Sequence, residues 1–380
     1  MLREILGILT GVSLALTVWR WALHRRFPLH LPECGAAGDA CPGITFLKPL
    51  KGADEATKDC LRSWLAQSYP GPAQFLFGVA SGDDPVCAAV RDLLAEFPHV
   101  DAQLILCPQN LGANRKVSTL RQLESLSKYP LLMISDADAR VSPHFAASIA
   151  SLCRKDVGLV NCFYRLANPA TLAMRWEAIA VNADFWTHVL QAATVKRIDF
   201  ALGAVMTVPA SELAAIGGFA ALSDYLADDY QLGQRIAARG RKIMLAPAVV
   251  DCWEPPMGWG AVWRHQLRWA RTIRVCQPGP FFVSIINNAG VWPLMLLAVS
   301  LRGPAWAVAL GLVALATRIG TAQQQLARMT QDRSYGRFWW LVPVKDVLDV
   351  VIWAAAFWGN HVEWRGERYR IIAGGQLVRV

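Results

Sequence analysis

The segment that most constrains the fold is a mostly apolar run near the N-terminus, EILGILTGVSLALTVWRWAL, at residues 4–23. A helix of about 20 such residues is long enough to cross the hydrocarbon core of a bilayer. The sequence HRR follows at residues 24–26, and because positive residues stay in the cytosol, we expect the next part of the chain to be cytosolic. A cleaved signal peptide is the alternative. Arg20 is flanked by two tryptophans, as in an interfacial anchor, and no small-residue cleavage site follows, so we predict a transmembrane helix over residues 1–26.

A second membrane region is predicted at residues 276–360. Two apolar runs, residues 281–301 and 304–320, are separated only by an arginine and a glycine, which predicts a hairpin of two crossings.

The last apolar run, residues 338–359, is more ambiguous. It carries Lys345, Asp346 and Asp349, and charged side chains are costly at bilayer depth. A single crossing would also place the basic tail, residues 361–380, outside the cytosol, against the positive-inside rule. We therefore predict a re-entrant or interfacial segment followed by a cytosolic tail, with a single crossing as the alternative.

The composition indicates that the chain binds a membrane surface rather than nucleic acid. The chain of 380 residues is 54 % hydrophobic, has a formal net charge of +9 and contains sixteen tryptophans. A basic balance suits nucleic acid or anionic lipid, but abundant tryptophan and long apolar runs favour the bilayer. Because no aromatic-basic RNA signature or recognition-helix pattern occurs, we expect no nucleic-acid partner.

Between the membrane segments, roughly residues 40–275, short apolar runs alternate with stretches of helix length. This alternation predicts an α/β sheet with both faces covered, and ligands of such sheets bind at the carboxyl ends of the strands. Four of the runs lead into the polar sequences KPLKG, SGDDP, NLGANRK and DAD, which we expect to share one edge of the sheet. The runs lie at residues 44–50, 74–80, 102–107, 131–135 and 157–162.

Asp136 and Asp138 directly follow one predicted strand. Side chains at i and i+2 of an extended strand point to the same face, so the pair can bind one object. The helix start at Ser142 and Pro143 needs neither carboxylate as a cap. An isolated DxD is common, but at a strand end two hard oxygen ligands suit Mg²⁺ or Mn²⁺ carrying a diphosphate.

Asp228 and Asp229 begin a predicted amphipathic helix within residues 226–240. A helix N-terminus favours negative charge, which accounts for Asp228 without any function. An attacking hydroxyl must lose its proton, however, and Asp229 is our candidate for the base that takes it. The helix dipole lowers the pKa of Asp229, whereas Asp228 and nearby phosphates raise it, and both outcomes stay open.

A third motif lies in GWGAVWRHQLRWARTIR, residues 258–274, which predicts an amphipathic helix. Arg271 and Arg274 fall nearest the membrane, so a position on anionic lipid is an equal alternative to a role in a site. For Arg268 and Trp269 we favour a site, because a guanidinium with an aromatic partner can stabilise a departing diphosphate.

As an ordered set, these motifs resemble the inverting glycosyltransferases of the GT-A fold, which use nucleotide-diphosphate sugars. The resemblance is greatest to the branch that contains ceramide glucosyltransferases and the bacterial hopanoid-biosynthesis glycosyltransferases. FLKPLKGAD is similar to the opening motif of that branch, SGDDP, SDADARV and LADDY to its three aspartate sites, and HQLRW to its (Q/R)xxRW element. IGGF is similar to the glycine pair ahead of the helix that carries the base. The resemblance implies a cytosolic GT-A domain at residues 40–275, flanked by transmembrane helices.

The resemblance also implies a role for each motif residue. Asp229 would be the catalytic base, and Asp136 and Asp138 would hold the Mg²⁺ or Mn²⁺ and the diphosphate. For Lys116, a solvated lysine on a helix surface is the alternative. The residues expected to bind the nucleotide sugar or border the acceptor are Lys48, Asp83, Asp84, Asn114, Lys116, Gly203, Asp228, His265, Arg268 and Trp269.

Two departures from the family bear on the acceptor. His265 stands where the element has Gln or Arg, which changes its hydrogen bonding and allows a dependence on pH. The segment AVNADFWTHVLQ lacks the His-Pro pair of animal ceramide glucosyltransferases, which disfavours ceramide.

We therefore expect a multi-pass enzyme of the bacterial inner membrane whose catalytic domain faces the cytosol. Its best-matching substrates are UDP-N-acetylglucosamine and the hopanoid bacteriohopanetetrol. Ceramide glucosylation from UDP-glucose is the close alternative, and an inactive relative acting as a membrane scaffold is a more distant one. A processive synthase or a nucleotide-sugar transporter would need more crossings.

Overall fold

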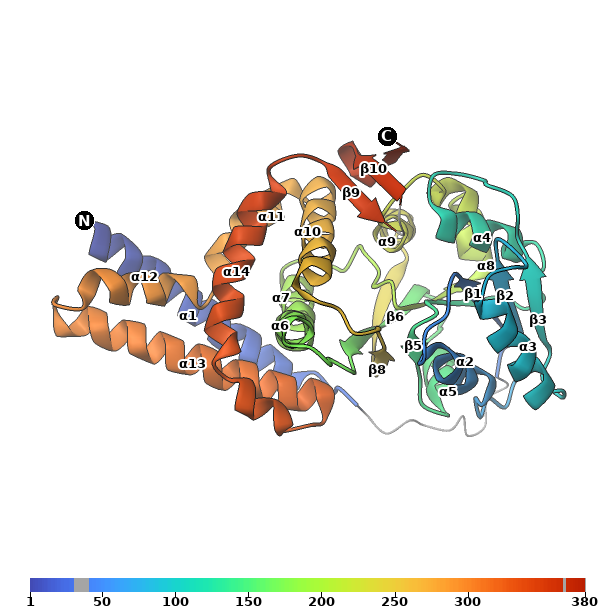
Figure 1. The fold of residues 1–380 in the computed structure, drawn as a ribbon, viewed down its shortest axis with the longest axis horizontal. Helices are drawn as coiled ribbons and strands as arrows, with labels where there is room; N and C mark the ends of the chain where they lie inside the picture. The colour runs from blue at the N-terminus through green and yellow to red at the C-terminus, as the bar shows by residue number, and fades with distance from the viewer. Residues whose placement is uncertain (31–40, 365–366, 380) are drawn as a thin grey trace.

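The computed structural model describes residues 1–30, 41–364 and 367–379. Figure 1 shows a sheet-based domain on one side of the molecule and an elongated group of helices on the other, with the N-terminus at the far end of the helices. The predicted domain boundary at residue 40 lies outside the described residues.

The domain is built on one eight-stranded mixed sheet with the order β3-β2-β1-β4-β7-β6-β8-β5. The first four strands in this order are parallel to one another, whereas β7 is antiparallel to both β4 and β6. All five predicted strands are present. The carboxyl ends of the first four, β1 to β4, meet at one edge of the sheet, as predicted. The strands are β1 (Ile44–Leu50), β2 (Ala73–Val79), β3 (Ala102–Leu106), β4 (Leu131–Ser135), β5 (Ala139–Arg140), β6 (Val157–Leu166), β7 (Val205–Pro209) and β8 (Lys242–Cys252).

Helices cover both faces of this sheet. Successive side chains along each central strand point to opposite faces, so each strand contributes to two hydrophobic cores. Phe46 of β1 packs in one hydrophobic core with Trp64 and Phe145, and the next residue, Leu47, packs in the other core with Leu120. The helices of the first face are α2 (Thr57–Leu65), α3 (Val86–Glu96) and α5 (Phe145–Ala150), and those of the second are α4 (Arg115–Glu124), α8 (Ala210–Ala215) and α9 (Asp228–Ala238).

Two helices, α1 (Leu2–Arg26) and α13 (Ala305–Thr330), are long and apolar enough to cross a membrane. The hairpin predicted over residues 281–320 differs in its first arm, where a helix pair is bent by 45° instead of forming one straight helix. Asn288 causes the break, since its side chain accepts hydrogen bonds from the backbone of Gly290 and Val291 where the second helix begins. The bent arm consists of α11 (Pro278–Val283), η3 (Ser284–Asn287) and α12 (Val291–Ser300).

The charges of the last apolar run are buried in an ion network. Arg318 of α13 donates two hydrogen bonds of 2.8 Å to Asp184 and bonds of 2.7 and 2.8 Å to Asp346. Lys345 pairs with Asp184 and lies 2.6 Å from Asp349. These partners offset the cost that we assigned to isolated charges. The run itself forms α14 (Leu341–Ala356), and Asp184 belongs to the π-helical segment η1 (Ala180–Phe185).

The basic tail is not a simple extension but a small antiparallel sheet, β11-β10-β9. It covers the loop before α9, where Leu226 donates a 3.0 Å backbone bond to Gly375 and Leu377 donates one of 2.7 Å to Asp224. These strands were not predicted from the sequence, because their alternating apolar residues lie among many charged ones. They are β9 (His361–Trp364), β10 (Glu367–Ile371) and β11 (Leu377–Arg379).

Candidate active site

Lys48 near the end of β1 lies beneath the DAD motif. Its side chain is 1 % exposed, and its Nζ donates to Ser135 Oγ at 2.6 Å and to the backbone oxygen of Asp136 at 3.0 Å. Burial lowers the pKa of Lys48 to about 7. The lysine therefore positions the end of β4 from below, whereas the sequence predicted a direct contact with the nucleotide.

Asp83 and Asp84 differ in their surroundings. Asp84 accepts backbone hydrogen bonds of 2.9 and 3.1 Å from Gly52 and one of 3.0 Å from Val86. It thus ties the loop after β1 to the start of α3. Asp83 is exposed at the surface of the same edge, so it is the one of the pair that is available to a ligand.

Lys116 joins the second and third aspartate motifs. Its Nζ lies 2.6 Å from Asp136 Oδ1 and 3.8 Å from Asp228 Oδ2, and its side chain is 8 % exposed. Burial by itself lowers the pKa of Lys116, but Asp136 and Asp228 outweigh this effect and the pKa is raised. The alternative of a solvated helix lysine is wrong.

Asn114 connects the start of α4 to the third aspartate motif. Its Oδ1 caps α4 by accepting from the backbone of Val117 at 3.1 Å, and its Nδ2 donates to the Tyr225 oxygen at 2.8 Å. A weaker contact of 3.4 Å reaches Asp228 Oδ1. Asn114 is fully buried and therefore acts on the position of Asp228.

Asp136 and Asp138 lie in a strongly acidic part of the site. Burial, together with the nearby charges of Asp136 and Glu254, raises the pKa of Asp138 to about 7. The side chain of Asp136 is 35 % exposed, so one carboxylate of the pair is open to a ligand. Crowded carboxylates of this kind are stabilised by a bound cation, and the donor set of hard oxygens fits Mg²⁺ or Mn²⁺.

Asp229 is held against the backbone of Gly203. A Cβ atom added at Gly203 would lie 2.7 Å from Asp229 Oδ2, and Asp229 Oδ1 accepts from the backbone of Tyr230 at 2.7 Å. Burial and the charge of Asp228 raise the pKa of Asp229 to about 7, against the opposing effect of Lys116. The sequence left open whether the helix dipole lowers the pKa of Asp229 or its neighbours raise it, and in the structure the pKa is raised.

The HQLRW motif lies on α10 (Trp259–Cys276), as predicted, and faces α6 (Leu172–Ile179). His265 Nδ1 and Gln266 Nε2 each lie 2.8 Å from Oε1 of the fully buried Glu177. The ring of Trp269 is 4.5 Å from that of His265 and packs beside Ala204, next to Gly203.

Glu177 and Glu254 were not predicted from the sequence. With His265 they offer ligand atoms within 4.8 Å of one another, the one such group of three found in the described part of the chain. Oε2 of each glutamate is buried without a hydrogen-bond partner. For Glu177, the sequence signal was a single carboxylate in the mostly apolar segment LAMRWEAI.

Arg271 and Arg274, for which we left a position on lipid open, contact the segment that leads into the C-terminal sheet. Arg271 donates to the backbone oxygens of His361 and Trp358 at 2.5 and 2.8 Å, and Arg274 donates to the side chain of Asn360. Both arginines fasten the C-terminal sheet to α10.

Comparisons with known proteins agree with this geometry. The sequence model of a family described as Glycosyl transferase family 21 matches residues 5–377. Ceramide glucosyltransferase 3 of Caenorhabditis elegans is 24 % identical over 205 residues, which cover 53 % of this chain and 44 % of the relative. Ceramide glucosyltransferase of Komagataella phaffii is 34 % identical over 103 residues, which cover 26 % of this chain and 20 % of the relative. The chain thus matches less than half the length of either.

Among solved structures, a mannosyltransferase of Pyrobaculum calidifontis, PcManGT in complex with GDP-Man and Mn²⁺, is similar to this chain with a TM-score of 0.53. It is 19 % identical, and the match covers 94 % of this chain and 99 % of that one. At this identity the likeness concerns the fold, and it confirms the predicted GT-A class of the α/β domain.

Proposed function

The chain belongs to glycosyl transferase family 21, a family of sugar-transferring enzymes, and we propose that it moves a sugar from a UDP-sugar to the hydroxyl of a membrane lipid with inversion. The observation that carries this proposal is the position of Lys116, whose Nζ bridges Asp136 and Asp228. The bridge joins Asp136 of the candidate diphosphate site to Asp228, the residue before the candidate base Asp229, and so supports a single site.

The proposed roles follow from the chemistry of the described side chains. Asp229 takes the proton of the acceptor hydroxyl as the oxygen attacks the anomeric carbon from the face opposite the leaving diphosphate. Lys116 and Arg268 supply positive charge where the diphosphate departs. A divalent cation held by Asp136 and Asp138 would supply a Lewis acid for the same leaving group. PcManGT was solved with Mn²⁺, which supports a divalent cation in this fold.

For the acceptor we keep a polyhydroxylated lipid such as bacteriohopanetetrol, with UDP-N-acetylglucosamine as donor. The segment AVNADFWTHVLQ, which lacks the His-Pro pair of animal ceramide glucosyltransferases, supports this acceptor over ceramide. Ceramide with UDP-glucose is the second candidate, and the names of the curated relatives favour it.

We further propose a multi-pass location in a bacterial inner membrane with the GT-A domain in the cytosol. Two helices long and apolar enough to span support a membrane location, and the basic end of α1 supports the orientation.

The test is to incubate the purified protein in detergent with UDP-glucose or UDP-N-acetylglucosamine, each with ceramide or bacteriohopanetetrol. Mass spectrometry of the lipid identifies the product, and its anomeric configuration reports inversion. We expect one donor and acceptor pair to dominate and chelation of divalent cations to stop turnover. Absence of lipid product with every pair would contradict the proposal.

Gly203→Ala should lower kcat by about 100-fold, because a misplacement of about 1 Å is that costly for a reacting group. The new methyl would lie 2.7 Å from Asp229 Oδ2 and force the carboxylate to move. Steady-state kinetics should show little change in KM for the donor. Gly258→Ala is the matched control, since nothing lies within 4 Å of its Cβ position. Wild-type turnover of Gly203→Ala would show that Asp229 need not occupy this position.

The rate should fall as the pH drops below about 7, because Asp229 has a pKa raised to about 7 and a base must be ionised. Asp138 titrates in the same range, so the profile of kcat/KM should be measured at limiting and at saturating Mn²⁺. Bound cation keeps Asp138 ionised, and the acid limb that persists at saturation reports Asp229. A rate that stays flat from pH 8 down to the ordinary titration range of an aspartate, about pH 4, would exclude Asp229 as the base.

A further inference from the structure

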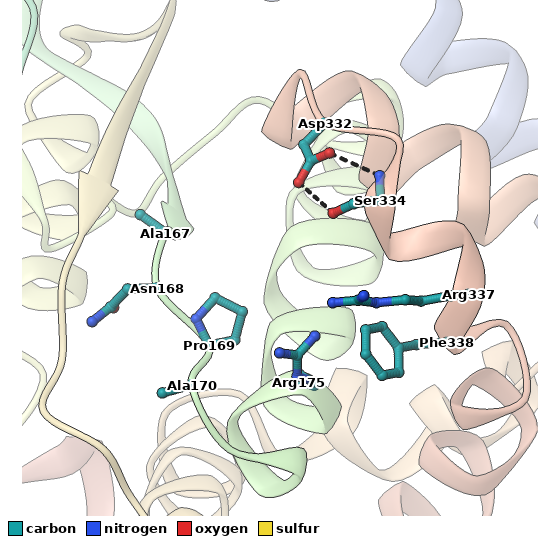
Figure 2. Close-up of a pocket in the computed structure, with 9 residues that line it drawn as sticks. All are labelled: Ala167, Asn168, Pro169, Ala170, Arg175, Asp332, Ser334, Arg337 and Phe338. Carbon is teal, nitrogen blue, oxygen red and sulfur yellow. Dashed lines mark hydrogen bonds between the residues drawn. The ribbon is translucent and has the colours of Figure 1, made fainter.

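A cavity of about 260 Å³ lies between the catalytic domain and the membrane helices. One wall is the loop of residues 167–170 after β6, and the other is the 3₁₀ segment η4 (Ser334–Phe338) together with Arg175 of α6. Figure 2 shows the side chains of Arg175 and Arg337 extending into the space beside Phe338. Since one water occupies about 30 Å³ in the liquid, the cavity has room for a phosphate group.

The two guanidinium groups share one aromatic ring. The Arg175 guanidinium lies 4.3 Å from the centroid of Phe338, and that of Arg337 lies 4.8 Å from the same centroid. Both guanidinium groups thus interact with the same ring, and their like charges repel each other.

Within the described parts of the chain, neither arginine forms an ion pair with a carboxylate. Asp332 also lines the cavity, but its oxygens accept hydrogen bonds of 2.7 and 2.6 Å from the backbone and hydroxyl of Ser334. Asn168 is occupied as well, since its amide exchanges bonds of 2.8 and 3.0 Å with the backbone of Glu254. The carboxylate of Asp332 keeps its negative charge and interacts with Arg337 at longer range, so two guanidinium groups face one carboxylate. The cavity thus has an excess of one positive charge, which an anion from outside the chain can balance.

The cavity lies at the depth of lipid headgroups. Segment η4 follows directly on the end of α13, and Arg328 near that end donates to the backbone oxygens of His24 and Phe27 at the end of α1. Trp339 and Trp340 come next and are 54 % and 42 % exposed, as is typical of side chains at a membrane interface. The basic end of α1 marks this interface as the cytosolic one.

We propose that this cavity binds the phosphate of an anionic lipid headgroup from the cytosolic leaflet, between Arg175 and Arg337. Guanidinium pairs form strong, directional hydrogen bonds to phosphate oxygens. A bound headgroup would connect η4 of the membrane region to α6, whose Glu177 contacts His265 and Gln266 of the HQLRW motif. The site is separate from the donor site and does not depend on which sugar is transferred.

The test measures binding of phosphatidylglycerol to the purified full chain in neutral detergent by native mass spectrometry. We compare Arg337→Gln alone and Arg175→Gln with Arg337→Gln against the matched control Arg25→Gln with Arg26→Gln, which removes two exposed charges from the same interface. We expect wild type and control to retain one phosphatidylglycerol, and both cavity variants to bind it at least about tenfold more weakly. Phosphatidylcholine should not be retained.

Three results would overturn the proposal. Equal weakening in the control pair would mean diffuse attraction to charge, and no retained lipid in the wild type would mean that no headgroup site exists. Displacement of the lipid by inorganic phosphate at similar concentrations would assign the cavity to free phosphate. Because Arg337 is exposed, its single variant keeps the test valid if the half-buried Arg175 is needed for folding.

Discussion

Asp229→Asn should lower turnover by about 100- to 10,000-fold, the range contributed by a positioned general base. Asparagine keeps the shape of the side chain and can still accept the 2.7 Å bond from the Tyr230 backbone, so the local structure should survive. What is lost is the ability to accept the proton of the acceptor hydroxyl. Product formation per enzyme, measured with saturating donor and lipid, reports kcat, and binding of the UDP-sugar should stay close to wild type.

Two further variants test whether the loss is specific to Asp229. Asp92→Asn removes the same charge from a surface carboxylate that lies 2.7 Å from Lys58, and it should leave turnover unchanged. Asp228→Asn alters the neighbour that Lys116 and Asn114 hold, so it should weaken donor binding more than kcat. Unchanged turnover in Asp229→Asn would exclude the residue as the base, and if the wild-type rate were equally low, it would favour an inactive scaffold.

The edge of the sheet that carries the candidate site was predictable because its signals are local. Each of the first four apolar runs is bounded by a polar sequence, and parallel pairing then requires their carboxyl ends to meet. Lys116 and the aspartates of SGDDP and DAD were placed on this basis. Asp228, Asp229 and the HQLRW helix were placed by their helical patterns and by the resemblance to a family. What local sequence did not supply was the neighbour of each side chain, such as Gly203 against Asp229 or Asp84 on the loop at Gly52.

The strands missed by the sequence analysis are those with weak local signals. β5 has only two residues, β7 has five and ends at a proline, and β8 contains Pro247 and is only partly buried along its length. Their pairing depends on contacts made across the sheet, and β7 runs antiparallel to β4 and β6. A periodicity search favours regular parallel strands and overlooks such segments.

In the membrane region too, contacts between residues far apart in the sequence were not predicted, here for charged side chains. Lys345 and Asp346 were judged as isolated charges because their partners, Asp184 and Arg318, lie far away in the sequence. A carboxylate in the apolar segment AVNADFW and an arginine in a predicted crossing were each visible. Only the folded chain shows that they form one buried network, which joins the π-helical segment to α13 and α14.

Arg318→Met should lower the free energy of unfolding by about 3–5 kcal/mol, the typical cost of removing one member of a buried ion pair. The guanidinium is 3 % exposed and donates four hydrogen bonds of 2.7 to 2.8 Å to Asp184 and Asp346. Methionine fills a similar volume but leaves two carboxylates with Lys345 as their remaining partner. Thermal unfolding of the purified protein in detergent should show a markedly lower midpoint.

The cause of this loss can be separated from a change in packing by balancing the charge. Adding Asp346→Asn to Arg318→Met removes one carboxylate along with the guanidinium, and we expect the double variant to regain part of the lost stability, because the penalty comes from an uncompensated buried charge. Arg302→Met, in the exposed turn between α12 and α13, should leave the unfolding midpoint unchanged. If the double variant were less stable than Arg318→Met alone, the four hydrogen bonds and the packing around them, rather than charge balance, would be what holds α13 to the π-helical segment.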